Sequence, residues 1–196
     1  MGRKRNARMP ARCATAPQLR AALRAATHEH HQKLDDLLGR LDLAERHDYV
    51  RFLDIQLSAR RGVERWLYLN APAHWLPPSQ ISLLRRDLDW LGDEARNASA
   101  PSFDAPASDR HAWIGAAWVL AGSSLGNTMM ERELAARAPA NWPMAFLQDK
   151  AMPQYFKALR PLLEDTAANP DALATARAVF AHFLSLAEQE MLAVPA

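Results

Sequence analysis

The sequence predicts an all-α fold that forms a single domain. Its 196 residues include 38 alanines and 27 leucines, but only 5 valines, 3 isoleucines, 5 threonines and 7 glycines. Because buried strands need β-branched residues, this composition almost excludes a β-rich fold or an α/β fold with a buried parallel sheet. A chain of this length can bury one sizeable core, and no run of apolar residues is long enough to span a membrane.

Three helices are expected in the first half of the chain. Apolar side chains keep three-four spacing over residues 17–38, and a second such pattern covers residues 45–69. A shorter helix follows, with Ser79 as its N-cap and Gly92 at its end. Residues 93–107 are polar and contain two prolines, which predicts a surface loop rather than a domain boundary.

Three further helices are expected after this loop. Ser108 is the expected N-cap of a long helix that reaches about Arg137. A helix over residues 153–166 is expected to bend at its internal proline. Asn169 and Pro170 are the expected N-cap and first residue of the last helix, which ends near residue 192.

The long fourth helix has an unusual composition in its middle. The segment from Gly122 to Asn127 contains two glycines and two serines, although each glycine costs a helix about 1 kcal/mol relative to alanine. Gly122 and Gly126 lie four residues apart, so both leave the backbone bare on one face, where another helix or a flat ligand can approach. The spacing alone does not decide between these two interpretations. Met129 and Met130 are expected to pack in the core.

The basic residues are concentrated at the N-terminus. Residues 1–16 hold five of the 24 basic residues and none of the 22 acidic ones, so the remainder has 19 basic against 22 acidic residues. We expect residues 1–16 to be a disordered, solvated tail, with a basic arm for an acidic partner as the alternative, and we expect no nucleic-acid partner for the folded part. The lone Cys13 and the absence of an apolar segment after the tail predict a cytoplasmic protein.

Histidines are concentrated in the first helix, at His28, His30 and His31. Their spacing is not that of a zinc protease, which needs two histidines four residues apart. At about 100° per residue, His30 falls inside the apolar stripe and His31 falls at its edge, beside Thr27 and Arg24. This edge can line a pocket for a planar anionic cofactor with His31 as a neutral ligand to its metal, and the alternative is a partly buried surface histidine.

Two segments together resemble bacterial haem oxygenases. Residues 23–35 (LRAATHEHHQKLD) resemble the proximal helix of that family, which has a leucine-arginine pair, a threonine, a histidine four residues later and a leucine-acid pair. Residues 118–127 (WVLAGSSLGN) resemble its distal helix, where a glycine-serine-x-leucine-glycine core bends over the haem. Residues 49–56 and 180–183 also fit in order and spacing, so the resemblance covers about residues 17–192.

The resemblance implies a haem oxygenase-like helical bundle over residues 17–196, with haem between the first helix and a kinked fourth helix. Haem would be both cofactor and substrate, and its iron would bind His31. The implied reaction converts haem to biliverdin, carbon monoxide and ferrous iron, using O₂ and an external electron donor such as a ferredoxin or a reductase. A phytochrome that receives the bilin is a further implied partner, and no membrane partner is expected.

The residues that match the family motifs take the implied roles. Gly122 and Gly126 would leave room on the side of the haem opposite His31. Arg24 and Arg177 would pair with the haem propionates. The expected catalytic residues are Gly122, Ser123 and Gly126, and the expected haem-binding residues are Arg24, Thr27, His31, Asn127 and Arg177.

Three positions depart from the family pattern. Ala121 stands where a glutamate is common, Ser123 where mammalian relatives have an aspartate, and Asn127 where glycine or alanine is usual. Ala121 and Asn127 motivate the alternative of a non-catalytic haem carrier or sensor on the same fold, and a helical bundle without haem is a second alternative. The helical spacing predicts that Asn127 points to the pocket margin and reaches a propionate, a water or a neighbouring backbone group.

Overall fold

The computed structural model describes residues 18–92, 101–105 and 109–192. These residues form six α-helices and one 3₁₀ turn, and their only bridge is an isolated pairing of Gln18 with Ala167. The all-α class is therefore confirmed. The helices are α1 (Leu19–Leu38), α2 (Arg46–Asn70), α3 (Ile81–Trp90), α4 (Ala112–Arg137), α5 (Ala151–Asp165) and α6 (Pro170–Leu192), with the 3₁₀ turn η1 at Ala73–Trp75.

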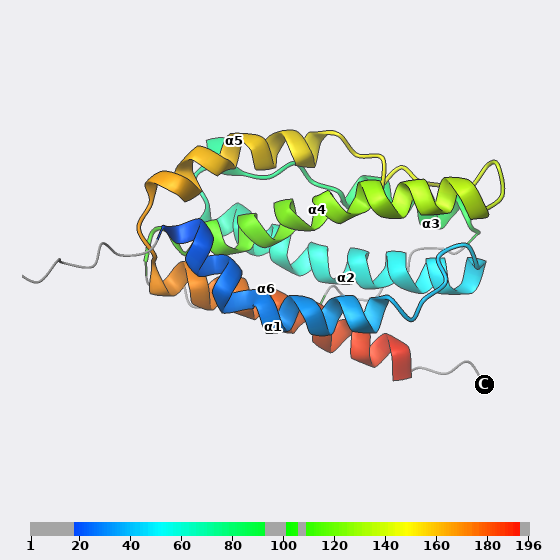
Figure 1. The fold of residues 1–196 in the computed structure, drawn as a ribbon, viewed down its shortest axis with the longest axis horizontal. Coiled ribbons are helices and arrows are strands. Elements are labelled where there is room, and N and C mark those ends of the chain that lie inside the picture. Colours follow the sequence, from blue (N-terminus) through cyan, green and yellow to red (C-terminus); the bar gives the residue numbers. More distant parts are fainter. Residues whose placement is uncertain (1–17, 93–100, 106–108, 193–196) are drawn as a thin grey trace, which may run out of the picture.

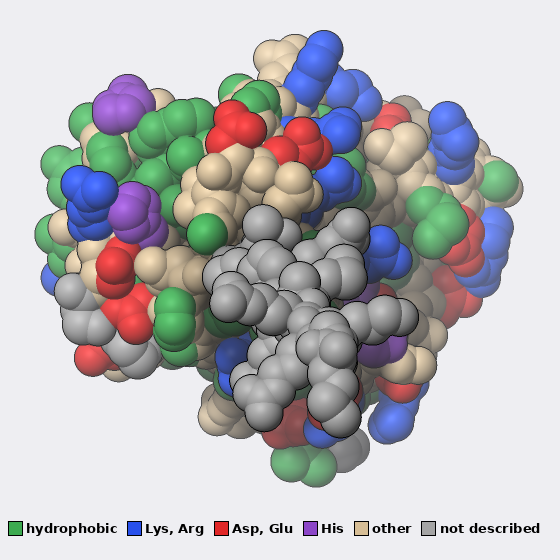
Figure 2. Space-filling model, turned by 60° about the vertical axis from the view of Figure 1, so that its left-hand side comes forward, with side chains coloured by type: hydrophobic (Ala, Val, Ile, Leu, Met, Phe, Trp, Pro, Cys, Tyr) green, Lys and Arg blue, Asp and Glu red, His purple; other side chains and the backbone are tan. Residues whose placement is uncertain are grey.

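The last helix is the centre of the packing. Helices α1, α2 and α4 all pack against α6, while α3 packs on α2 and α5 packs on α4 (Figure 1). One core region surrounds Leu120 and Val179, which are fully buried, and a second lies between α2 and α3 around Leu53 and Leu88. None of the described helices is long and apolar enough to cross a membrane. Figure 2 shows one face of the molecule, on which acidic and basic side chains lie close to one another.

Most helix ends follow local sequence signals. The Asn169 side chain accepts the N–H of Ala172 at 2.9 Å, which confirms the predicted N-cap of α6. After α3, Gly92 has a φ of 69°, in the left-handed region that glycine adopts without strain. Helix α5 continues through Pro161. Helix α4 is unbroken across its two central glycines, and its two halves run at different inclinations in Figure 1.

Three details differ from the expectations or were missed. Helix α3 begins at Ile81 with Gln80 at the N-cap position, so the prediction of Ser79 as the N-cap is wrong. The Ser79 hydroxyl accepts the Ile81 N–H only at a long 3.4 Å. Helix α4 begins after a turn in which the Asp109 carboxylate accepts the N–H of His111 at 2.6 Å, whereas the predicted cap Ser108 lies outside the described residues. The turn η1 was not predicted. The predicted tail, residues 1–16, also lies outside the described residues.

The contact between α4 and α6 depends on Gly115. A Cβ atom at this position would lie 2.0 Å from the carbonyl oxygen of Ala172 on α6. No side chain fits there, so the two helix backbones approach each other closely at this point. The packing fixes the N-terminal half of α4 on α6.

Candidate functional site

Helices α1 and α4 both pack on α6 and leave an open groove between them. Its volume is about 1690 Å³, larger than the usual range of about 300–1,000 Å³ for small-ligand pockets. Phe180 and Phe183 of α6 contribute to its lining. The α1 wall includes Arg20, Arg24, Thr27, His28, His31 and Asp35, and the α4 wall includes Gly122, Ser123, Leu125, Gly126, Asn127 and Met129.

Seven of the eight predicted site residues line this groove, and Arg177 does not. Arg177 is exposed on α6, where its charged head is in solvent, so the structure gives no support to its expected pairing with a ligand in the groove. The charge of Arg177 alone does not show which face of helix α6 this residue occupies. Arg20, one turn before Arg24, is the further basic residue of the α1 wall.

His31 is oriented by a residue of its own helix. Its Nδ1 lies 2.7 Å from Oδ2 of Asp35, and its ring centroid lies 5.6 Å from that of Phe180. The side chain is 56% exposed. Because Nδ1 faces the carboxylate, Nε2 is the nitrogen left to bind a metal. His30 is not among the residues that line the groove.

The other predicted residues of the α1 wall have different environments. Thr27 is buried, and its hydroxyl donates to the carbonyl of Leu23 at 2.8 Å, so the helix backbone already uses this hydroxyl. Arg20 forms an ion pair of 3.2 Å with Glu164 of α5. Arg24 has no ion pair with any described residue. The groove therefore has an available cation near the start of α1.

The two central glycines of α4 face open space. A Cβ atom on Gly122 would meet nothing within 4 Å outside its own stretch of helix, and one on Gly126 would lie 3.9 Å from Cε of Met130. Close helix packing occurs instead at Gly115. The geometry therefore contradicts the helix-packing interpretation of this glycine pair and leaves a bare backbone that a flat ligand can approach.

Large apolar side chains on the α4 wall are exposed to the groove. Leu125 is 59% exposed and Met129 is 73% exposed, and both line the groove. The expectation that Met129 packs in the core is wrong, because α1 stands away from this face of α4. Exposed apolar side chains of this size are typical of a binding surface.

Two polar residues of the α4 wall are held from behind the groove. Ser123 accepts a hydrogen bond from Nη2 of Arg60 at 2.8 Å, and its hydroxyl donates to the Leu120 carbonyl at 2.9 Å. Asn127 is 5% exposed, and its Nδ2 lies 3.4 Å from the carbonyl oxygen of Phe146. Asn127 thus lies against a neighbouring backbone group. The sequence did not predict the contact of Arg60 with Ser123, because the helical spacing of α4 does not show which residues of other helices pack against it.

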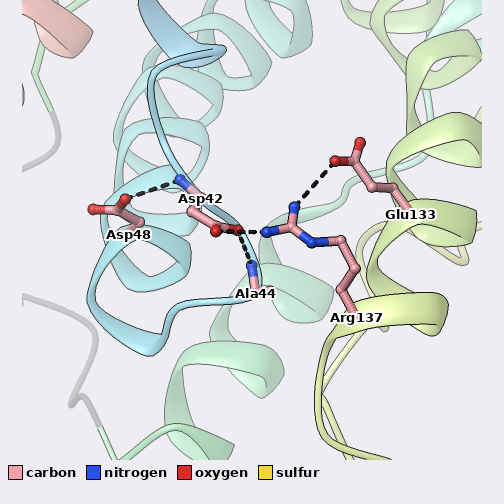
Figure 3. A network of polar contacts seen from close by, with 5 residues as sticks. All are labelled: Asp42, Ala44, Asp48, Glu133 and Arg137. Atoms are coloured by element: carbon pink, nitrogen blue, oxygen red, sulfur yellow. Dashed lines mark hydrogen bonds and ion pairs between the residues drawn. The ribbon is translucent and has the colours of Figure 1, made fainter.

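An ion network joins the two walls at the far end of the groove (Figure 3). Arg137 near the end of α4 contacts Asp42 at 2.6 Å and Glu133 at 3.3 Å. Asp42 accepts the N–H of Ala44 at 3.1 Å and donates its own N–H to Asp48 at 2.9 Å. The Ala44 N–H, followed by Arg137, lowers the pKa of the Asp42 carboxyl. The connection after α1 is thereby tied to the last turn of α4.

The donor set of the groove fits haem. Within the described residues no group of three or more His, Cys, Asp or Glu side chains could hold a metal ion. A single imidazole such as that of His31 is the usual protein ligand of an iron whose other ligands come from a porphyrin. The groove offers one imidazole nitrogen, basic side chains for carboxylates, apolar side chains and bare backbone opposite. These are the contacts that a flat iron macrocycle with propionate groups needs.

Comparisons with known proteins point to one family. A curated haem oxygenase from Xanthomonas campestris pv. campestris (strain 8004) is 34% identical over 124 residues, which make up 60% of this chain and 73% of that protein. The crystal structures of NO- and CO-bound haem oxygenase from Neisseria meningitidis include one similar to this fold. Its TM-score is 0.68 at 18% identity, over 91% of this chain and 94% of that chain. No family model matches the sequence.

Proposed function

The chain belongs to the haem oxygenase family, and we propose that it binds haem in the groove between α1 and α4 and cleaves it to biliverdin, carbon monoxide and ferrous iron. One observation carries this proposal. His31, anchored by Asp35, stands on one wall of a groove whose other wall is the bare backbone of Gly122 and Gly126. Nothing in the groove favours the alternative of a non-catalytic carrier or sensor.

The α1 wall holds the haem iron in this proposal. The Asp35 carboxylate accepts the Nδ1 proton of His31 at 2.7 Å, which fixes the ring and makes Nε2 a better electron donor. Nε2 of His31 would then be the protein ligand of the haem iron. Arg24 is the first candidate to pair with a propionate, because Arg20 already has an ion pair with Glu164.

The α4 wall keeps the opposite side of the haem open. Haem supplies the iron that activates O₂ and the macrocycle that is cleaved. Gly122 and Gly126 leave space that any side chain would fill. Leu125 and Met129, together with Phe180, offer apolar contacts to the macrocycle and keep water away from it. Asn127, held against the Phe146 carbonyl, leaves this space free.

The remaining components of the reaction come from outside the chain. The proposal includes O₂, an external electron donor such as a ferredoxin or a reductase, and a phytochrome as a receiver of the bilin. The reducing cytoplasm is the proposed compartment, on the sequence evidence of a single cysteine. None of these partners determines how the groove holds haem.

A spectroscopic titration tests the proposal. Haemin added to the purified full chain should give a Soret band that saturates at one haem per chain. Reductant and O₂ should then remove the Soret band and raise the red absorption of a bilin, with catalase present to exclude free peroxide as the oxidant. Stable haem binding without a bilin would favour the carrier, and no saturable binding would contradict both functions.

A further inference from the structure

The two walls of the groove are attached mainly to other helices and not to each other. Helices α1 and α4 each pack on α6, but neither packs extensively on the other. At its N-terminal end, α1 is joined to the end of α5. The Leu19 N–H donates to the Thr166 carbonyl at 2.9 Å, and Arg20 pairs with Glu164 at 3.2 Å. Direct packing of α1 on α4 therefore does not fix the width of the groove.

One ion pair joins the two walls at the far end of the groove. Nη2 of Arg137, the last residue of α4, lies 2.6 Å from Oδ2 of Asp42 in the connection after α1 (Figure 3). Among the described residues, no other ion pair joins residues 18–45 to α4. Leu41 and Leu134, close to the pair in the chain, line the groove. The pair thus connects the walls where the groove reaches its far end.

Asp42 keeps its position whether or not Arg137 contacts it. Its N–H donates to Oδ2 of Asp48 at 2.9 Å, and its Oδ1 accepts the Ala44 N–H at 3.1 Å. Its carbonyl accepts the Glu45 N–H at 2.8 Å. All three contacts lie within the connection and the start of α2. The carboxylate is therefore a fixed point that Arg137 can reach and leave.

Arg137 also keeps a partner when it leaves Asp42. Its Nη1 lies 3.3 Å from Oε1 of Glu133, one turn earlier on the same helix. The side chains of Arg137 and Asp42 are 51% and 41% exposed, so water can solvate both charges after they separate. Exposed pairs of this kind contribute little free energy. The contact between the walls can therefore break at low cost and form again.

We propose that the Arg137–Asp42 ion pair is a latch that opens when haem enters or leaves the groove. The inference rests on the proposed function, in which haem lies between the walls, so that the walls have to separate to release it. The pair is intact in the closed chain with or without haem, and it is broken during passage. Weakening it should therefore accelerate uptake and loss by the same factor and leave haem affinity unchanged.

Haem exchange with the full chain tests the latch without turnover. Loss is measured as the transfer of haemin from the loaded chain to excess apomyoglobin, and uptake as the binding of CO–haem to the empty chain after rapid mixing. Arg137→Gln and Asp42→Asn should each raise both rates about two- to fivefold, the effect of one exposed ion pair. Asparagine at position 42 retains an oxygen for the Ala44 N–H. The double variant should be no faster than either single variant, because both changes remove the same contact.

Glu133→Gln is the matched control. It removes the other ion pair of Arg137, which lies within α4 and does not join the walls. Both exchange rates should stay at the wild-type values. Added salt should bring the wild-type rates closer to those of Arg137→Gln, because salt screens the exposed pair that only the wild type has.

Each contrary result has a distinct meaning. Unchanged rates in Arg137→Gln and Asp42→Asn, or an equal increase in Glu133→Gln, would overturn the latch. Faster loss with unchanged uptake would also overturn it, because the pair would then stabilise bound haem and not control its passage. A wild-type chain that takes up no haem would contradict the proposed function and this inference together, whereas the other outcomes leave the proposed function intact.

Discussion

Two residues of the α1 wall, Thr27 and His31, make their hydrogen-bonding contacts within one helix, whereas Ser123 and Asn127 of the α4 wall contact other parts of the chain. On α1, His31 is held by Asp35 four residues later, and Thr27 by the Leu23 carbonyl four residues earlier. On α4, Ser123 is held by a residue of α2, and Asn127 lies against a carbonyl after the helix. A change on α1 should therefore act on ligation alone, whereas a change on α4 affects the space above the haem and its support.

Loss of the His31 imidazole is the largest expected effect. His31→Ala should abolish the five-coordinate imidazole signature in resonance Raman spectra of the haem-loaded chain, and bilin formation with it. His30→Ala is the matched control, because His30 is next to it on α1 but does not line the groove. If His30→Ala loses the signature and His31→Ala keeps it, the ligand assignment is wrong.

Two glycines of α4 should respond in opposite ways. Gly122→Leu should leave the melting temperature unchanged or raise it, because the leucine side chain meets open space. The same side chain fills that space, so single-turnover bilin yield should fall about 100-fold. Gly115→Ala should destabilise the fold by about 1–3 kcal/mol or more, because its Cβ would clash with Ala172.

Denaturant unfolding and bilin yield separate these two variants. The folded fraction of Gly115→Ala should keep the wild-type haem spectrum. A destabilised Gly122→Leu, or one with full turnover, would show that the groove does not extend over that glycine.

Asp35→Asn should weaken the binding of His31 to the haem iron without removing the imidazole. The amide cannot accept the Nδ1 proton of His31 as strongly as the carboxylate, so the imidazole becomes a poorer donor to iron. Changes to groups behind metal ligands typically cost about 10–100-fold in affinity or activity. The iron–histidine stretching frequency should fall in the ferrous state. An unchanged frequency would show that Asp35 does not interact with His31 when haem is bound.

The sequence predicted the α1 wall better than the α4 wall, because contacts within one helix follow from helical spacing and contacts with other elements do not. Helical spacing brought Arg24, Thr27 and His31 to one edge, and all three line the groove. It could not show that α1 stands away from Met129, since a methionine in the core and one facing a groove have the same spacing. Nor could it distinguish the buried Arg60 from its neighbour Arg61, because burial depends on α4 and on the segment around Phe146.

The fold itself was largely predictable. The six helices follow apolar periodicity that is local, and their ends follow prolines, glycines and the Asn169 cap. The turn η1 has no such pattern. Arg177 does not line the groove, and its expected role stays a prediction. Because α6 contacts three other helices, the sequence alone does not tell which of its faces meets the groove.

The ion network between the walls should have a small effect that depends on pH. The pKa of Asp42 is lowered in the folded chain, so its contribution to stability is present above the ordinary value of 3.8 and is lost as the pH falls below it. Arg137→Gln should lower the melting temperature slightly near neutral pH and less below pH 3.8. High salt should also shrink the difference, because the pair is exposed. If the melting-temperature difference between Arg137→Gln and the wild type is the same below pH 3.8, the loss of stability comes from packing and not from the ion pair.

Asn127→Gly should have the smallest effect on turnover. The Asn127 amide makes only a long contact of 3.4 Å with the Phe146 carbonyl, and glycine costs a helix a few tenths of a kcal/mol more than asparagine. Stability should therefore fall by no more than about 1 kcal/mol. Because the amide lies against that carbonyl, its removal opens little space above the haem. Single-turnover bilin yield should stay close to that of the wild type. An inert wild type that becomes active as Asn127→Gly would instead show that this amide blocks the groove, and the natural chain would then be a haem-binding protein on an enzyme's fold.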